Sequence, residues 1–256
     1  MRARRFVALG ASLLVFALAL GACGKEVAGP LADADRAMAK LDAARIDLAV
    51  MATKADDSRS ENPVGFRMEG PFSYEDDRPF PELDLRYTSL LGARQQAVRV
   101  VSDGHTVELV HDSGARTAVP PQQANLLRLG PGNGGIADLG IGGWVKDAAV
   151  VERPDGTRLV TGQVNVADLL SDLARINAQA AGTEAGKSLD GDRARRLDRL
   201  ARQSEFTAEL DHNDLPRQLR ATLDFGPEMP AELRAALGPY ASPRLEVSLS
   251  VQPTEH

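Results

Sequence analysis

Apolar and polar residues alternate with a period of two over much of the chain, as they do in β-strands that bury one face. In residues 46–50, for example, Ile46, Leu48 and Val50 alternate with Asp47 and Ala49. The same alternation returns in residues 66–75, 83–88, 206–210, 219–225 and 245–251. Ser-Asp-Gly and Asp-Ser-Gly sequences between strand-like segments supply residues that tolerate tight turns. The pattern therefore predicts an antiparallel sheet with one apolar face and one face exposed to water.

Three stretches have the period of an amphipathic helix. The first begins at Asp33, with Asp33 or Asp35 as a candidate N-cap, and continues toward Arg45, where the period changes to two. The second covers residues 166–176, and a weaker third covers residues 194–201. We expect these helices to lie over the apolar face of the sheet, which predicts an α+β fold.

The first 23 residues have the features of an export signal. Three arginines within residues 2–5 precede an apolar run over residues 6–20. Fifteen residues are too few to span a bilayer, which takes about 20, but they suit a signal-peptide core. Residues 20–23, Leu-Gly-Ala-Cys, resemble the lipobox of bacterial lipoproteins, whose cysteine is acylated and becomes the first residue after cleavage. Cys23 is the only cysteine of the chain.

The resemblance implies that Cys23 is a lipid anchor, and the alternative is a stray cysteine in an ordinary secretory peptide. The expected organisation is a signal peptide over residues 1–22, a lipidated tether over 23–32, and a single domain over 33–256. The protein would lie at the outer face of the cell membrane. After cleavage, 27 basic and 36 acidic residues remain, a formal balance of −9. This balance disfavours nucleic acid as a partner, because its binding needs clustered Lys and Arg, and it equally disfavours adhesion to anionic lipid.

Motifs that resemble catalytic or nucleotide sites lie in the wrong context. Residues 181–188 match a loose P-loop pattern but follow an amphipathic helix instead of a buried strand. The glycines of residues 130–135 have dinucleotide-fingerprint spacing without a surrounding βαβ unit. His105 and His111 would be about 20 Å apart on an extended strand, too far for one metal ion. We therefore expect no enzyme activity, no cofactor and no metal site.

Residues 139–173 carry a resemblance to a known family. A Trp-containing turn leads there to a strand, a turn, a second strand and a helix, with matching residues at Trp144, Lys146, Asp147, Gly162, Val164, Val166 and Leu170. This order resembles the LppX/LprG-type lipoproteins of actinobacteria, within the wider LolA/LolB-like fold. The resemblance implies a curved, half-open antiparallel sheet, a half-barrel, with helices covering its concave apolar face. It also implies an apolar cavity for acylated lipids.

The sequence and the resemblance together give a candidate ligand site. The residues expected to line it are Phe66, Met68, Phe72, Tyr74, Leu83, Leu85 and Tyr87, with Trp144 at the rim and the glycine-rich residues 130–143 as a gate. The ligand would be a lipid or another hydrophobic molecule, bound by a monomer anchored to the membrane.

Two alternatives stay open at this point. The same apolar residues would serve equally well as a filled core without a cavity. The fold would then serve a non-catalytic sensory or interaction module that engages an envelope protein partner. A hydrolase would need a buried polar cluster that the sequence does not reveal.

Overall fold

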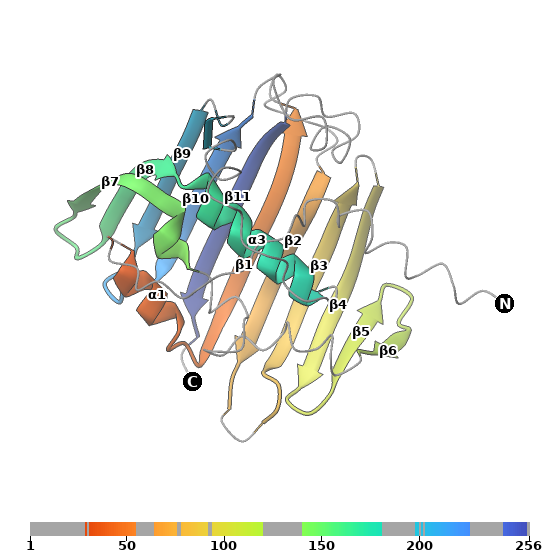
Figure 1. Cartoon of the computed structure of the whole chain (residues 1–256). Helices are drawn as coiled ribbons and strands as arrows, with labels where there is room; N and C mark the ends of the chain where they lie inside the picture. Colours follow the sequence, from red (N-terminus) through yellow and green to blue (C-terminus); the bar gives the residue numbers. More distant parts are fainter. Residues whose placement is uncertain are drawn as a thin grey trace.

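One antiparallel sheet of eleven strands forms most of the molecule (Figure 1). The computed structural model describes residues 29, 31–54, 64–75, 78–91, 94–119, 140–180, 198–199, 201, 203–225 and 243–254. The strands are β1 (Ala43–Lys54), β2 (Val64–Ser73), β3 (Glu82–Leu91), β4 (Arg94–Asp103), β5 (Val107–His111), β6 (Arg116–Ala118), β7 (Val145–Glu152), β8 (Arg158–Val164), β9 (Gln203–Leu210), β10 (Pro216–Asp224) and β11 (Pro243–Pro253). The helical elements among these residues are α1 (Ala32–Met38), the 3-10 helix η4 (Ile141–Trp144) and α3 (Val166–Ala180).

The strand order divides the sheet into two runs of neighbouring strands. It is β6-β5-β4-β3-β2-β1-β11-β10-β9-β8-β7, so each run pairs strands that follow one another along the chain. The two runs meet where β1 pairs with β11, from Ala44 opposite Pro253 to Lys54 opposite Pro243. The first and last strands of the domain therefore form the centre of the sheet.

The register places the alternating residues on two opposite faces. Leu48 lies opposite Leu249 of β11 and Met68 of β2, and Met68 lies opposite Tyr87 of β3. Directly opposed residues of antiparallel strands share a face, so these side chains form one apolar face. Asp47 lies opposite Ser250 and Glu69 on the other, polar face. The period-two pattern of the sequence is thus confirmed strand by strand.

Gly70 permits a close approach between the backbones of β2 and β3. A Cβ atom at this position would lie 2.2 Å from the backbone oxygen of Asp84, and the φ of Gly70 is +149°. Between Glu69 and Phe72 the pairing of β2 with β3 is interrupted, although the register on both sides is the same. Pro71 lies at this interruption in an interior strand, which is consistent with its lack of an N–H to donate.

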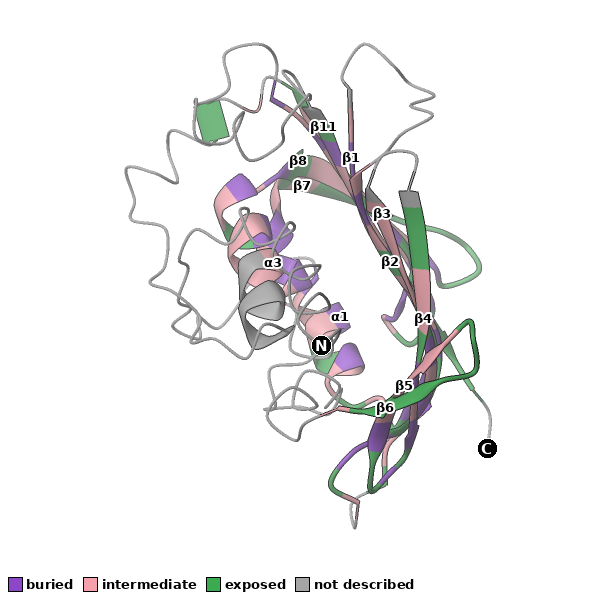
Figure 2. Cartoon of the chain, turned by 90° about the vertical axis from the view of Figure 1, so that its right-hand side faces the viewer, coloured by how far each residue is buried: buried purple, intermediate pink, exposed green. Residues whose placement is uncertain are grey.

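The predicted α+β class is wrong, because the described residues form a mostly-β fold. Their two α-helices have 7 and 15 residues against eleven strands. Both lie on one side of the curved sheet (Figure 2). A helix of 15 residues is about 22 Å long, whereas eleven strands at about 4.8 Å spacing extend over about 48 Å. The expected layer of helices covering the apolar face is therefore not what the structure shows.

The predicted helices match the structure unequally. The one expected over residues 166–176 is confirmed as α3. The helix expected from Asp33 ends at Met38, and Leu31 occupies its N-cap position without a side-chain capping bond. Ala43 already belongs to β1, whose pairing with β11 and β2 takes up the residues that could have continued the helix.

Candidate functional site

The apolar face of the sheet is buried unevenly. Over β9, β10 and β11 its apolar side chains are buried, and Phe206, Leu219 and Val247 are completely buried. Over β1 to β5 many are only partly buried although they pack against the core. We call this part the open half and define it as Val50, Val64, Phe66, Met68, Tyr87, Val98 and Leu109. Partly exposed large apolar side chains that lie together are a typical feature of binding surfaces.

Four of the seven residues predicted to line the ligand site lie outside the open half. Phe72, Leu83 and Leu85 are buried members of the hydrophobic core. Tyr74 follows β2 directly and is half-buried, and its backbone N–H donates to the carbonyl of Asp42. Phe72, Leu83 and Leu85 are therefore part of a filled core, which was the alternative interpretation of these residues.

The other three predicted residues of the early strands, Phe66, Met68 and Tyr87, lie together in the open half. The rings of Phe66 and Tyr87 are stacked, with centroids 5.8 Å apart and an angle of 21° between the planes. Met68 lies opposite Tyr87 in the register. Burial raises the pKa of the Tyr87 hydroxyl above its ordinary value. The structure thus brings these three residues into one partly buried apolar surface.

Trp144 lies in the interior and not at a rim. Its side chain is completely buried in η4, and its Nε1–H donates to Oδ2 of Asp172 in α3, 2.8 Å away. The backbone N–H of Gly140 donates to the same oxygen at 2.9 Å. The described end of the glycine-rich segment, residues 140–143, is therefore held against α3.

A second carboxylate binds the same segment from the other side. Both carboxylate oxygens of Asp35, in α1, lie 3.2 Å from the backbone nitrogen of Gly142, which donates to them. Burial is the main cause that raises the pKa of Asp35 to about 6, and the nearby charge of Asp172 acts in the same direction. The bond from Gly142 acts in the opposite direction and stabilises the ionised form.

We call Asp35, Asp172 and the three N–H groups of Gly140, Gly142 and Trp144 the carboxylate clamp. It joins α1, η4 and α3, which are far apart in sequence, through hydrogen bonds of 2.8–3.2 Å. Because their oxygens accept bonds from the protein itself, the two carboxylates have a structural role in this arrangement. Asp172 lies between the apolar residues Leu169 and Ile176 at helical spacing. A carboxylate within the apolar stripe of α3 was therefore the signal in the sequence that could have indicated its structural role.

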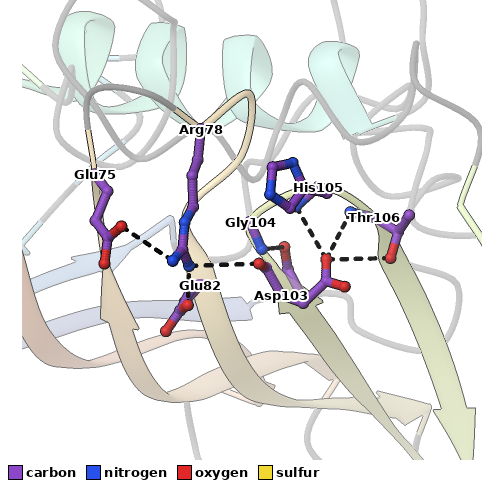
Figure 3. Close-up of polar contacts among 8 residues, drawn as sticks. Glu75, Arg78, Glu82, Asp103, Gly104, His105 and Thr106 are labelled. Atoms are coloured by element: carbon purple, nitrogen blue, oxygen red, sulfur yellow. Dashed lines mark hydrogen bonds and ion pairs between the residues drawn. The ribbon is translucent and has the colours of Figure 1, made fainter.

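Arg78 connects two loops at one end of strands β2 to β5 (Figure 3). The Arg78 guanidinium forms ion pairs with Glu75 and Glu82, which flank the connection between β2 and β3. Its Nη1 also lies 3.5 Å from the carbonyl oxygen of Asp103, at the end of β4. The backbone N–H of Phe80 donates to the carbonyl of Gly104 at 3.0 Å. These contacts fix the β2–β3 connection to the turn between β4 and β5.

The turn after β4 has the predicted Ser-Asp-Gly geometry. Gly104 has a φ of +88°, and the Asp103 carboxylate accepts the N–H groups of His105 and Thr106 at 2.9 and 2.8 Å (Figure 3). These bonds, with that of Thr106 first, lower the pKa of Asp103 to about 2. His105 is exposed in this turn, and His111 ends β5. Within the described ranges no three His, Cys, Asp or Glu side chains are placed to hold a metal ion.

The polar face carries cross-strand ion pairs and a polar pocket. Ion pairs on this side join Arg67 to Asp47, Arg99 to Asp84, Arg116 to Glu108, Arg153 to Glu209 and Arg220 to Glu246. The pocket is lined by Gln163, Ala201, Gln203, Ser204, Glu205, Thr222, Asp224 and Arg244. Most of these residues are polar or charged, so the pocket does not fit a hydrophobic ligand. It is separate from the residues predicted to bind one.

Several predicted features lie outside the described residues. They are the signal peptide over 1–22, Cys23 and most of the tether, the glycines of 130–135, the P-loop-like residues 181–188, and most of the helix expected over 194–201. In the part of the chain that the structure describes, no helix combines the length and the hydropathy needed to cross a membrane.

Comparisons with known proteins do not assign a family. No protein-family model matches the chain, and a search of curated proteins finds no significant relative. The resemblance to the LppX/LprG-type lipoproteins therefore remains a prediction from the sequence.

Proposed function

We propose that this protein is a lipid-anchored envelope protein that binds a lipid or another hydrophobic molecule on the open half of its apolar face, without covalent chemistry. The observation that carries the proposal is the uneven burial of that face. The apolar side chains of strands β9 to β11 are buried, whereas Phe66, Met68 and Tyr87 keep part of their surface accessible to solvent. A protein that needed only a packed core would gain stability by covering these side chains as well.

The anchor part of the proposal rests on the sequence around Cys23. Leu31, at the start of α1, is completely buried in the core. Seven residues, 24–30, separate it from Cys23, and the eight steps from Cys23 to Leu31 extend over at most about 28 Å. Acyl chains on Cys23 would therefore hold the α1 end of the domain close to the membrane surface. Two or three chains would give stable anchoring, because each buried CH₂ contributes about 0.8 kcal/mol.

Two adjacent substitutions on β4 test the binding site. Val98 belongs to the open half, and Ala97 points to the polar face with the same partial burial. We expect Val98→Glu to abolish lipid adducts in native mass spectrometry after incubation with envelope lipid vesicles, because it places a charge in the apolar surface. Ala97→Glu should keep them. Equal adducts in both variants, or none in the wild-type protein, would contradict the proposal.

The anchor is tested separately by Cys23→Ser. We expect this variant to move from the membrane to the soluble fraction and to lose labelling by a radioactive fatty acid. A variant that stays as membrane-bound as the wild type would contradict anchoring through Cys23, whatever the outcome for ligand binding.

One observation favours the alternative of an interaction module. Val150 and Val151, on the edge strand β7, are 43% and 56% exposed although their side chains are large and apolar. An edge strand with exposed valines can accept a strand of a partner protein. If the protein serves this function, Val151→Lys should prevent cross-linking to an envelope protein in cells while leaving lipid adducts unchanged.

A further inference from the structure

We propose that two copies of this chain, anchored in one membrane, pair through the free edges of their β7 strands, in antiparallel orientation and centred on Val150. This inference goes beyond ligand binding, and it rests on the proposed function only for the anchor. It starts from the position of β7 at the end of the sheet (Figure 1).

The outer edge of β7 carries backbone groups that point away from the sheet. In the described part of the sheet, β7 is the last strand and pairs with β8 alone. The N–H of Arg153 donates to the carbonyl of Thr157 across the turn, and the register is regular from there back to Ala149. Because bonded and non-bonded pairs alternate along antiparallel strands, the N–H and C=O groups of Val150 and Glu152 face outward. These groups can bond a further strand.

Side chains on both faces of this edge are apolar and exposed. Val150 and Val151 are consecutive residues of the strand, so they lie on opposite faces, and both are exposed. The features that usually protect an edge strand flank this stretch and do not interrupt it. They are the register shift between Lys146 and Ala149 and the turn residue Pro154. A strand added here would cover apolar surface on both faces as well as make backbone hydrogen bonds.

The charges along β7 favour a second copy in one register. Two antiparallel copies are related by a two-fold axis, so each contact occurs twice. An axis nearer the Glu152 end would bring the two Glu152 carboxylates together, and an axis nearer the other end would run into the register shift. An axis at Val150 avoids both, because Glu152 then lies opposite Ala148 of the second copy. It also brings the exposed Asp147 near the exposed Arg153 of the second copy, a pair of opposite charges.

The symmetry of this pairing suits two chains anchored in one membrane. A two-fold axis between antiparallel strands of one continuous sheet is perpendicular to that sheet, so both copies turn the same face in the same direction. Helices α1 and α3 lie on one side of the curved sheet (Figure 2). Since the tether precedes α1, both anchors would approach the membrane from the same side.

The contact is too small to hold two copies together in dilute solution. The five residues from Ala148 to Glu152 extend over about 17 Å. Stable interfaces bury about 1,200 Å² or more, which an edge contact of this length does not reach. Anchoring confines both chains to the membrane surface and raises their effective concentration, which favours weak contacts. We therefore expect pairs in the membrane and monomers in dilute solution.

Single cysteines in β7 test this pairing, because Cys23 is the only native cysteine and its sulfur would be acylated in the anchored chain. Two copies of Val150→Cys would face each other with Cα atoms about 5.5 Å apart, within the range of a disulfide. Two copies of Val151→Cys would be diagonal neighbours about 7–8 Å apart, too far for one. Val151→Cys is the matched control, because Val151 is adjacent and more exposed.

Both full-length variants are purified from membranes, reconstituted into phosphatidylcholine vesicles, oxidised briefly with copper phenanthroline and examined on non-reducing gels. We expect a dimer band for Val150→Cys and its loss for Val151→Cys. In a Cys23→Ser background without vesicles, Val150→Cys should lose the dimer band at low protein concentration and regain it when the protein is concentrated.

Equal dimer bands for both variants in vesicles, or none for Val150→Cys, would overturn the pairing and leave ligand binding and the anchor standing. A dimer band as strong in dilute solution as in vesicles would overturn its dependence on the anchor. In native membranes, a cross-link to a different protein in place of the dimer would show that this protein occupies the edge, and would also overturn the inference. Failure of the anchor is detected separately, because the concentrated soluble chain reports on pairing without it.

Discussion

The carboxylate clamp predicts that the protein becomes less stable as the pH rises through the range in which Asp35 ionises. Burial raises the pKa of Asp35 to about 6, whereas the ordinary value is 3.8. Between these values the folded protein binds a proton that the unfolded chain has released. The free energy of unfolding contributed by this group is therefore fully present below about pH 4 and is lost as the pH rises through 6.

The size of the effect follows from the difference between the two pKa values. At about 1.4 kcal/mol for each pH unit, it corresponds to about 3 kcal/mol between pH 4 and pH 8. Asp35→Asn removes the ionisation but keeps a carbonyl oxygen that can accept the N–H of Gly142. We expect the free energy of unfolding of this variant to be about the same as that of the wild type at pH 4, where Asp35 is protonated in the folded protein, and to be higher by up to about 3 kcal/mol at pH 8, where the wild type carries a buried charge.

The measurement is urea unfolding followed by circular dichroism, for both proteins at five pH values from 4 to 8. Asp33→Asn is the matched control, because Asp33 lies on the same helix and its half-exposed carboxylate pairs with Arg36. Exposed pairs of this kind contribute at most about 1 kcal/mol. If the difference between wild type and Asp35→Asn stays constant over the whole pH range, the reasoning about the buried carboxylate is refuted.

Three further predictions concern the sheet. Gly70→Ala should lower the free energy of unfolding by about 2–4 kcal/mol in urea titrations, because its Cβ would meet the backbone of Asp84. Gly114→Ala is the control. Gly114 has a φ of +79° and open space around it, so this substitution should lower the free energy of unfolding by only about 1 kcal/mol. Phe206→Ala should remove about 3–5 kcal/mol, since this ring is completely buried, and a smaller loss would mean that the core collapses around the gap. Arg99→Gln should change stability by less than about 1 kcal/mol despite its two-point contact with Asp84, and a larger loss in calorimetry would contradict the weakness of exposed ion pairs.

Local patterns in the sequence were sufficient to predict the strands and their faces. Alternation assigned Phe66, Met68 and Tyr87 to one face, and the register confirms this. The turn at Gly104 was also predictable, because Ser-Asp-Gly has a local conformational preference. Such signals depend on neighbours within a few residues, which is why the sequence alone reveals them.

Contacts between distant segments were not predictable in the same way. Trp144 was expected at a rim, but its indole N–H is paired with Asp172, which lies 28 residues later. Asp35 and Gly142 are 107 residues apart, so no spacing in the sequence announces their hydrogen bond. The α+β class failed for a related reason. Amphipathic stripes indicate that helices exist, but not how much of an eleven-stranded sheet they reach.

The pairing of the first and last strands has a consequence for how the protein matures. Strand β1 cannot complete its central contacts until β11 has been synthesised, almost 200 residues later. Until then, the nascent chain from β1 to β6 exposes an apolar surface and a strand edge, both of which favour aggregation. Long-range pairing of this kind also slows folding. Export in an unfolded state, as the proposed function requires, would be compatible with this delay.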